Sequence, residues 1–468
     1  MEKYNVKVGG RPVEVHQARV SALPLNKLFD GEQRPLEQTE IAYFVTVDIE
    51  QEERMEIQLS ESFDTCELRP LSKNIGYERQ GNTLFIPVKE AGQFTVEIDG
   101  FHHALHVFVN EKSIAPQDCT MYFKKGIHDV GLLWLESNQT IYLEEGAILN
   151  GVIYGKDVNN IKICGRGILN SACCRRGRDE HEGGQEIKNV LRSKGFDEDN
   201  INYLGSMVLQ NCKNVFVEGI TLVDSPLWTV IIRDNCEDVV VDNIKIIGQW
   251  RYNSDGVDIC TSKNVILRNS FIRSFDDCIV VRGAHLPGEE GTTENVLVEN
   301  CVCWNDWNIA LEVWCGYKQS TIRNVVFKDN YIIHICSVVM DIKTWAGSTN
   351  TRMENITFDG IYVDADKEYR NCCVESRDRK GYIEDQNYTP DMIRMYVEVL
   401  GKPVGVGTQI CDNTADSSEY RLLYRNIKFH KIKYSGKTLP SYIKPIQDIL
   451  TIENVSFSEC DFELLLNF

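Results

Sequence analysis

The chain repeats one short pattern over most of its length. An Asn or Asp precedes a run of alternating apolar residues, and a second short apolar run follows a polar residue or Gly, as in KNVILRNSFI from Lys263 to Ile272. The residue that opens the pattern recurs at Asn160, Asn214, Asp238, Asn264, Asn295, Asn324, Asn355, Asn426 and Asn454. Six of the spacings are 24, 26, 31, 29, 31 and 28 residues, and the two longer ones indicate insertions. A repeat of this length is typical of a solenoid.

Strands this short cannot bury a face alone, so neighbouring repeats must stack on one another, and the Asn at a fixed place can cap the bend. The alternation has a period of two, which argues against helical and leucine-rich repeats. We therefore expect an all-β chain with a right-handed parallel β-helix over residues 116–468, with insertions at about 171–205 and 365–420. Within the second insertion, Thr389, Pro390 and a following Gly-Lys-Pro predict a short helix.

Residues 1–115 lack the repeat. They alternate in short apolar segments separated by polar turns, such as YFVTVDIE, NTLFIPV and QFTVEIDG. This pattern predicts a small N-terminal antiparallel β-sandwich as a separate domain.

The overall charge and the terminal segment limit the partners that we expect. The formal net charge is −19, from 50 Lys and Arg against 69 Asp and Glu, which argues against a nucleic-acid surface. No apolar run is long enough to span a membrane, and the N-terminus lacks the apolar core of a secretory signal. The sequence therefore predicts a cytoplasmic protein, if Met1 is the native start.

The chain contains 17 cysteines, and most of them lie inside apolar strand-like runs, as do Cys260 and Cys278. Free buried thiols fit this placement better than a disulfide framework does. The close cysteine pairs do not have the spacing of a zinc site. We expect no metal and no cofactor.

Three aspartates mark the place where chemistry is expected. Asp255 precedes the adjacent pair Asp276 and Asp277 by 21 and 22 residues, which is about one coil. Since stacked coils lie about 4.8 Å apart, the three carboxyl groups should be neighbours and should raise at least one pKa. A protonated carboxyl and an ionised one together suit acid and base work on a glycosidic bond. The alternative is that each Asp merely occupies a turn, but three at this interval favour a functional site.

From about residue 138 to about residue 362 the sequence resembles the polygalacturonases of glycoside hydrolase family 28. The segments that carry the resemblance are GITLVDSPLWTVIIRDNCEDVVVDNIKI, NSDGVDI, SFDDCIVV and DIKTWAG. The resemblance implies a right-handed β-helix and inverting hydrolysis, with Asp276 as general acid and with Asp255 and Asp277 activating water. The segment CVCWNDWNIALEVWCGY is similar to family 49, the dextranases and isopullulanases, which carry an N-terminal β-sandwich on the same β-helix.

Two departures from the family 28 pattern concern substrate charge. Residues 307–314 contain no His where the family has Gly-His-Gly, and Asp341-Ile342-Lys343 stands where the family has Arg-Ile-Lys. In polygalacturonases the two bases of the latter segment grip the galacturonate carboxylate. An acidic Asp341 weakens such a site, so a neutral glycan is slightly favoured over a uronate.

Further polar and aromatic residues near the same face are candidates for substrate binding. They are Asn253, Arg282, His285, Glu312, Trp314, Asp341, Lys343 and Trp345. Aromatic rings could stack on sugar faces or could pack between coils, and this alternative also applies to Trp228. Charged residues in the loop after the Asp pair could line a groove or could simply be solvated.

We therefore expect a glycoside hydrolase, inverting and exo-acting on oligosaccharides, because long insertions beside the Asp trio can turn a groove into a pocket. A uronate-specific exo-polygalacturonase acting on pectic oligosaccharides is one alternative. A polysaccharide lyase, which needs calcium and an Arg or Lys base, and a non-catalytic glycan-binding solenoid are alternatives of other classes. The expected partner is an oligosaccharide or polysaccharide, with no nucleic acid and no membrane, and a homo-oligomer is left open.

Overall fold

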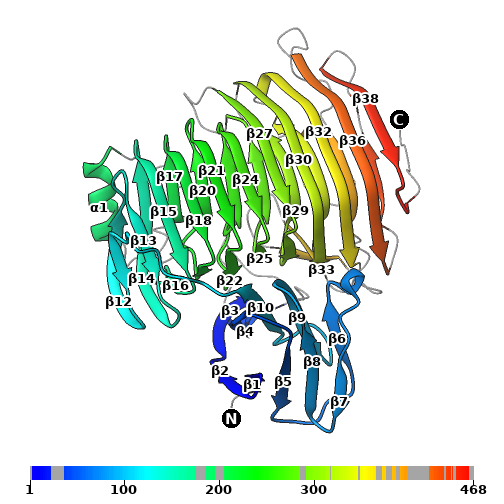
Figure 1. Ribbon diagram of the computed structural model, residues 1–468. Coiled ribbons are helices and arrows are strands. Elements are labelled where there is room, and N and C mark those ends of the chain that lie inside the picture. Colours follow the sequence, from blue (N-terminus) through cyan, green and yellow to red (C-terminus); the bar gives the residue numbers. More distant parts are fainter. Residues whose placement is uncertain are drawn as a thin grey trace.

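The fold is all-β, as the sequence predicts (Figure 1). The computed structural model describes residues 3–22, 36–174, 185–195, 205–284, 291–316, 318–345, 348–364, 372–375, 382–385, 390–398, 421–436, 439–443, 445 and 449–462. The helical segments in these ranges are η1 (Leu36–Gln38), η2 (Leu71–Lys73) and α1 (Gln185–Ser193). No helix in the same ranges is long and apolar enough to cross a bilayer.

The N-terminal strands form two five-stranded sheets, in the orders β2-β1-β5-β8-β7 and β3-β4-β10-β9-β6. Their bounds are β1 (Tyr4–Val8), β2 (Arg11–Val13), β3 (His16–Ser21), β4 (Thr39–Ile49), β5 (Glu53–Leu59), β6 (Cys66–Arg69), β7 (Glu78–Gln80), β8 (Thr83–Val88), β9 (Gly92–Ile98) and β10 (Leu105–Glu111). All pairings are antiparallel except the parallel pair β4 and β10. Alternate residues of both sheets, such as Ile57 and Val107, pack into one core, which makes a β-sandwich.

A single sheet of 26 strands winds through the rest of the described chain as a right-handed parallel β-helix. Its strands are β11 (Met121–Phe123), β12 (Gly126–Trp134), β13 (Thr140–Leu143), β14 (Ala147–Lys156), β15 (Asn159–Gly165), β16 (Ile168–Asn170), β17 (Gly205–Gln210), β18 (Lys213–Glu218), β19 (Thr221–Val223), β20 (Trp228–Arg233), β21 (Glu237–Asp242), β22 (Lys245–Ile247), β23 (Val257–Cys260), β24 (Lys263–Arg268), β25 (Phe271–Ser274), β26 (Ile279–Arg282), β27 (Thr292–Glu299), β28 (Val302–Asn305), β29 (Ile309–Cys315), β30 (Lys318–His334), β31 (Val338–Trp345), β32 (Ser348–Asp364), β35 (Asp391–Glu398), β36 (Arg421–Ser435), β37 (Ser441–Ile443) and β38 (Leu450–Ser458). Strands β33 (Cys372–Glu375) and β34 (Tyr382–Asp385) form a separate antiparallel pair.

Each strand pairs with its equivalent one coil later, so that like residues stack along the solenoid. Val265 pairs with Val296, which in turn pairs with Val325, and all three lie in the apolar interior. Phe327 and Phe358 stack with their ring centroids 4.8 Å apart, and the stack continues through Phe429 and Phe457. The interior is therefore apolar, and polar chemistry is confined to the outer faces and the turns.

The nine repeat residues named above occupy one bend of the solenoid. All of them have φ between 53° and 58°, a left-handed conformation that Asn and Asp tolerate better than most residues. Their amides form a ladder in which Asn295 donates to Asn264 at 3.0 Å and Asn324 donates to Asn295 at 3.1 Å. The Asn or Asp repeats in the sequence because each coil needs, at this bend, a residue that adopts a left-handed conformation and whose side chain bonds to the next coil.

The predicted helix after Thr389 is wrong. Residues Asp391–Glu398 form strand β35, which pairs in parallel with β31 and places Ile393 beside Met340. The strand is buried on both faces, including Ile393 and Met395 in the interior. Pairing with a preceding coil outweighs the local capping signals, so part of the predicted insertion at 365–420 belongs to a coil.

Buried polar contacts join the sandwich to the solenoid. Figure 1 shows the sandwich against one edge of the coils. Lys245 donates to Asn110 Oδ1 at 2.6 Å, and His334 Nε2 lies 2.6 Å from Glu97 Oε1. The chain passes from sandwich to solenoid between Glu111 and Met121. The cysteines whose side chains the structure describes are free, and most of them are buried, in agreement with the expected thiols.

Candidate active site

The three aspartates come together at the start of two consecutive strands of one sheet. Asp255 precedes β23, and Asp276 and Asp277 precede β26, which pairs with β23 in register. The backbone N–H of Gly256 donates to the carbonyl oxygen of Asp277 at 2.8 Å, so that the two turns are stacked. One carboxyl oxygen from each Asp lies within 4.8 Å of the others. Each of the three side chains is buried, with 1% to 6% of its residue exposed.

Gly256, which follows Asp255, packs so closely against the next coil that no side chain fits at its position. A Cβ at this residue would lie 2.3 Å from the carbonyl oxygen of Cys278 and 2.4 Å from Ile272 Cγ2. The close approach of the two turns therefore requires glycine, and this requirement holds Asp255 against the following coil.

The environment favours protonation within the trio. Burial raises the pKa of Asp255 and Asp277 well above the ordinary value and also raises the pKa of Asp276. Neighbouring carboxylates add to each rise, with Asp258 acting on Asp255 and Glu312 acting on Asp277. Three negative charges at this separation are unfavourable, which favours a protonated carboxyl group within the trio.

Hydrogen bonds orient the Asp pair. Asn308 donates to Asp276 Oδ1 at 2.9 Å, and Asn253 donates to Asp276 Oδ2 at 3.3 Å. The backbone N–H of Ile309 donates to Asp277 Oδ1 at 3.1 Å. The sequence prediction included Asn253 but missed Asn308, which lies in the turn before β29.

Arg282 supplies positive charge to the trio. Its guanidinium lies 2.9 Å from Asp255 Oδ2, 3.8 Å from Asp277 Oδ2 and 2.6 Å from Asp258 Oδ1. The group is also sandwiched between the rings of Trp228 and Trp314, at 4.4 and 4.6 Å from their centroids. Trp314 pairs with Arg282 one coil on. Both rings are buried and hold the Arg282 guanidinium beside the trio.

Asp258 belongs to the site although the sequence prediction passed over it. Its pKa rises to about 6 because burial outweighs the opposing effect of Arg282. In β23 it alternates with the inward residues Val257 and Ile259, so it points to the outer face. The signal available in the sequence was this alternation within the segment NSDGVDI.

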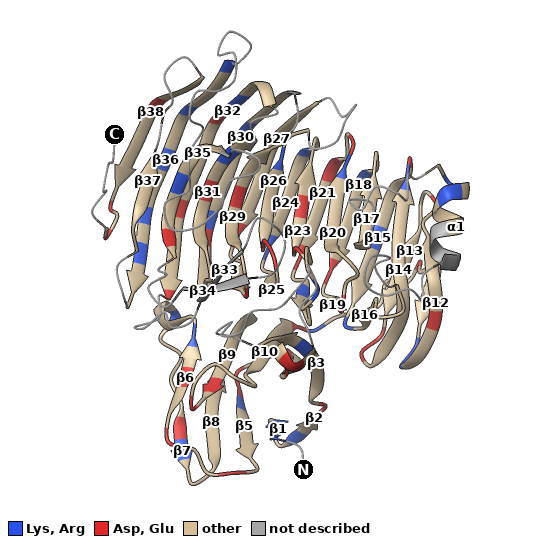
Figure 2. Cartoon of the chain, turned by 180° about the vertical axis from the view of Figure 1, so that it is seen from behind, with Lys and Arg blue, Asp and Glu red and all other residues tan. Residues whose placement is uncertain are grey.

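A second charged cluster lies on the same outer face, one and two coils further on. Lys343 Nζ lies 2.7 Å from Glu312 Oε1 and 3.5 Å from Asp341 Oδ2, and both carboxylates are buried. Glu312 and Asp341 pair in register between β29 and β31. Figure 2 shows acidic residues on both of these neighbouring strands. Asp341, which stands where family 28 has Arg, therefore lies directly beside Lys343.

Two predicted residues cannot be placed in the site. His285 lies outside the described residues. Trp345 ends β31, where its backbone pairs with Glu398, but its side chain lies outside the described part of the chain.

The geometry suits proton transfer at a bond held against this face. A protonated carboxyl can donate while an ionised neighbour accepts, and both are oriented by surrounding donors. The three Asp oxygens are also close enough to share a cation. Arg282 places one positive charge 2.9 Å from Asp255, beside four carboxyl groups.

Comparison with known proteins places the chain in a family. Residues 123–376 match the model described as Glycosyl hydrolases family 28. Probable endopolygalacturonase D of Neosartorya fischeri is 27% identical over 199 residues, which cover 41% of this chain and 36% of that protein. Probable exopolygalacturonase B of Aspergillus terreus is 28% identical over 245 residues, which cover 43% of this chain and 54% of that protein. The chain thus spans about a third to about half of the length of these curated relatives.

A solved structure supports the fold across both domains. Dex49A from Penicillium minioluteum superimposes with a TM-score of 0.58 at 13% identity, covering 97% of this chain and 88% of that chain. The likeness extends over the sandwich as well as the solenoid. The family 28 match spans more than half of this chain and contains every described residue of the site, so the chain belongs to glycosyl hydrolases family 28.

Proposed function

We propose that this protein is a glycoside hydrolase that cleaves an O-glycosyl bond with Asp255, Asp276 and Asp277. The observation that carries the proposal is the meeting of three buried carboxyl groups within 4.8 Å, with raised pKa values and a fixed guanidinium beside them. A non-catalytic glycan-binding solenoid would not need buried carboxyl groups in mutual repulsion. A lyase would need a basic residue placed to abstract a proton, whereas Arg282 is engaged by three carboxylates, those of Asp255, Asp258 and Asp277.

The proposed mechanism is inverting, with different roles within the trio. Arg282 pairs with Asp255 and Asp277, which favours the ionised form of these two as the groups that activate water. Asp276 protonates the departing oxygen in this scheme. In the protein without substrate, however, burial and neighbouring carboxylates raise the pKa of Asp255 and Asp277 further than that of Asp276. The scheme therefore requires the shared proton to move to Asp276 when a substrate oxygen lies beside it. Asn308 and Asn253 hold its carboxyl group in a fixed orientation. These roles follow the family resemblance, whereas the amide donors on both oxygens of Asp276 by themselves favour its ionised form.

The proposed substrate is a neutral oligosaccharide. Around the trio and Lys343, six carboxyl groups lie close to two cations: Asp255, Asp258, Asp276, Asp277, Glu312 and Asp341, with Arg282 and Lys343. One coil further on, Arg394 pairs in register with Asp341 and forms an ion pair with Asp391. A uronate would bring another negative charge to a cluster in which Lys343 already contacts Glu312 and Asp341. The second candidate is cleavage of galacturonate chains, which the similarity to polygalacturonases favours.

We also propose that the enzyme cleaves its oligosaccharide substrate from the chain end. It rests on the insertions predicted on either side of the Asp trio, most of whose residues lie outside the described ranges. A time course of products tests it, since an exo enzyme releases one small product from the start. A ladder of intermediate sizes from a long polymer would show instead that the groove is open.

The test of catalysis replaces each Asp of the trio by Asn and measures reducing-sugar release from a panel of neutral and uronic oligosaccharides. Each of the three changes should lower turnover by about 10² to 10⁴, because each removes a proton donor or acceptor from a nearly isosteric side chain. Asp238→Asn is the matched control, since Asp238 occupies the bend ladder where the repeat elsewhere has Asn. Near wild-type rates in two of the three trio variants would overturn the catalytic assignment.

The stereochemical outcome tests the roles separately. NMR of the first-formed product should show an inverted anomeric configuration. A retained configuration would leave hydrolysis standing but would overturn the assignment of Asp255 and Asp277 as groups that activate water, since the carboxyl arrangement governs the outcome.

A further inference from the structure

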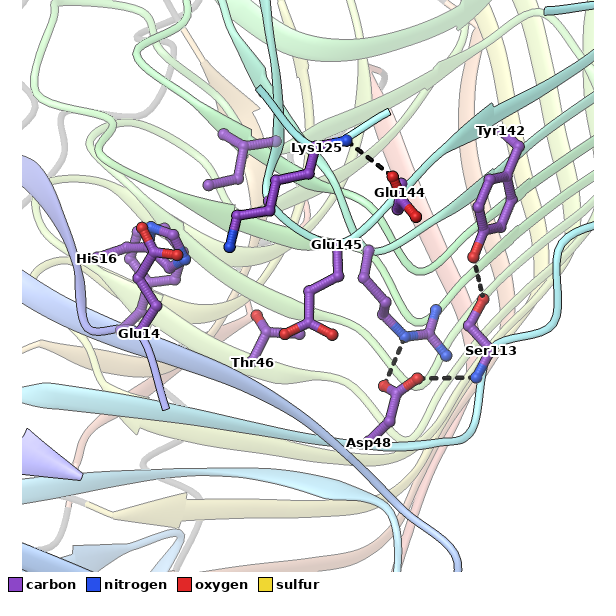
Figure 3. A pocket seen from close by; sticks show the side chains of 13 residues that line it. Glu14, His16, Thr46, Asp48, Ser113, Lys125, Tyr142, Glu144 and Glu145 are labelled. Atoms are coloured by element: carbon purple, nitrogen blue, oxygen red, sulfur yellow. Dashed lines mark hydrogen bonds and ion pairs between the residues drawn. The ribbon is translucent and has the colours of Figure 1, made fainter. Parts of the chain in front are cut away.

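A cavity of about 460 Å³ lies where the sandwich meets the first coils of the solenoid (Figure 3). Its lining comes from β3 and β4 of the sandwich, from the connection near Ser113, and from β13 and the coils on either side. None of its lining residues belongs to the Asp trio or to the Lys343 cluster. The volume falls within the range of about 300 to 1,000 Å³ that is usual for small-molecule sites.

The floor of the cavity is a fixed polar network. Arg166 is 6% exposed, and its guanidinium donates to Asp48 Oδ1 at 2.9 Å, to Glu218 Oε1 at 2.7 Å and to the carbonyl oxygen of Glu111 at 2.9 Å. Asp48 also accepts from the backbone N–H of Ser113 at 2.8 Å. These bonds join the two domains and hold the floor rigid before any ligand arrives.

The rim carries charged side chains that project into the same space. Figure 3 shows the Lys125 ammonium and the Glu145 carboxylate pointing toward the centre, with Glu14 beside His16. Within the described part of the chain, the side chains of Lys125, Glu145 and Glu14 make no hydrogen bond or ion pair. The stem of Lys125 lies across Gly146, where a Cβ would approach Lys125 carbons to 3.0–3.1 Å. Gly146 thus makes room for Lys125 to extend over the cavity.

His16 adds an uncharged polar group to the wall. Its ring stacks on Phe44 with centroids 5.1 Å apart and an interplanar angle of 27°. Burial lowers its pKa, so the imidazole is neutral near pH 7. A neutral imidazole offers one donor and one acceptor, and neither ring nitrogen has a hydrogen-bond partner among the described residues.

The charges of the lining select the class of ligand. Four carboxylates face two cations: Glu14, Asp48, Glu144 and Glu145, with Lys125 and Arg166. The excess of negative charge disfavours an anion. A metal is also disfavoured, since no group of His, Cys, Asp or Glu in the described ranges other than the Asp trio is close enough to hold one. A sugar hydroxyl can donate to a carboxylate and accept from an ammonium, so it suits both kinds of rim group.

We propose that this cavity is an accessory binding site for a neutral saccharide of one or two sugar units. The site would hold a glycan against the seam between the two domains, independently of the Asp trio. It goes beyond the proposed hydrolysis and does not rest on it.

The test measures binding to the full chain of glucose, galactose, maltose, cellobiose and lactose, by saturation-transfer NMR and calorimetry. Lys125→Ala and Glu145→Gln should each weaken binding by about tenfold, the loss expected for one hydrogen bond to a charged group. Both residues are exposed, so the fold should tolerate the changes. Lys124→Ala and Glu136→Gln are matched controls, because both residues are exposed and neither lines the cavity.

A fifth variant separates this site from the proposed active site. Asp276→Asn should leave binding at the cavity unchanged. Binding that is lost in Asp276→Asn but unaffected by Lys125→Ala and Glu145→Gln would assign the signal to the Asp trio and overturn the proposal. Absence of binding for every sugar in the panel would also overturn it, as would tighter binding of galacturonate than of galactose.

Discussion

Removal of the charge of Arg282 tests the electrostatics of the site without a known substrate. Arg282→Met keeps an unbranched apolar stem between Trp228 and Trp314 but removes the guanidinium. Two buried carboxylates, Asp255 and Asp258, then lose a partner at 2.9 and 2.6 Å. Breaking a buried ion pair from one side costs about 3 to 5 kcal/mol in the free energy of unfolding, because the remaining charge stays buried. We expect a loss of this size near pH 8.

The loss should shrink at lower pH, and its direction follows from the raised pKa values. Asp258 has a folded-state pKa of about 6, above its ordinary value of 3.8. A carboxyl group of this kind binds its proton more tightly in the folded chain, so stability falls as pH rises between the two values. Without Arg282 the folded-state pKa rises further, and the fall continues to higher pH. The difference between wild type and Arg282→Met is therefore largest above pH 7 and smaller at pH 5.

Urea unfolding at pH 5 and pH 8 measures the difference, since urea is uncharged and does not screen the ion pairs. Arg282→Lys keeps a cation and should lose less stability at pH 8 than Arg282→Met. Arg323→Met removes a surface partner of Glu294 and should change stability little at either pH. An equal loss for Arg282→Met at both pH values would refute the reasoning, because it would show that Arg282 acts by packing between the tryptophans.

Three further predictions concern the solenoid and its chemistry. Asn295→Ala should lower the free energy of unfolding by about 2 kcal/mol in urea titration, from its φ of 57° and its ladder bonds, and Asn295→Gly should lose less. Phe358→Ala should cost about 3 to 5 kcal/mol by the same measurement, since the ring is buried between Phe327 and Phe429. A chelator should leave the rate of sugar release unchanged, because Arg282 supplies the positive charge beside Asp255; a loss restored by a divalent cation would contradict this role.

The bend ladder shows why the solenoid could be predicted from the sequence. Each coil needs a residue at one place that accepts positive φ and that bonds to the coils before and after it. Only a few residue types meet both conditions, so the requirement appears in the sequence as a recurring Asn or Asp. Because coils stack, the separation of about one coil between Asp255 and Asp277 in the sequence predicted that their carboxyl groups lie close together.

The sequence prediction missed two residues of the site, Asp258 and Asn308, whose contacts are with residues one coil away. Asp258 and Asn308 acquire their roles only because Arg282 and Asp276 stack beside them. No local pattern marks such a contact. The segment after Thr389 failed for the same reason, since its capping signals are local whereas its partner, β31, lies about 50 residues earlier in the sequence. Sequence reasoning thus located the coils and the trio but not the contacts that couple adjacent coils.

The length of the coils explains why the trio lies where it does. Between β23 and β26 the register advances from Val257 to Ile279, which is 279 − 257 = 22 residues, whereas between β26 and β29 it advances from Ile279 to Leu311, which is 311 − 279 = 32 residues. In the shorter coil the two turns are in direct contact, since the backbone N–H of Gly256 donates to the carbonyl oxygen of Asp277. Carboxyl groups placed on this coil are positioned by backbone hydrogen bonds and not by flexible loops. Acid and base catalysis needs such fixed geometry.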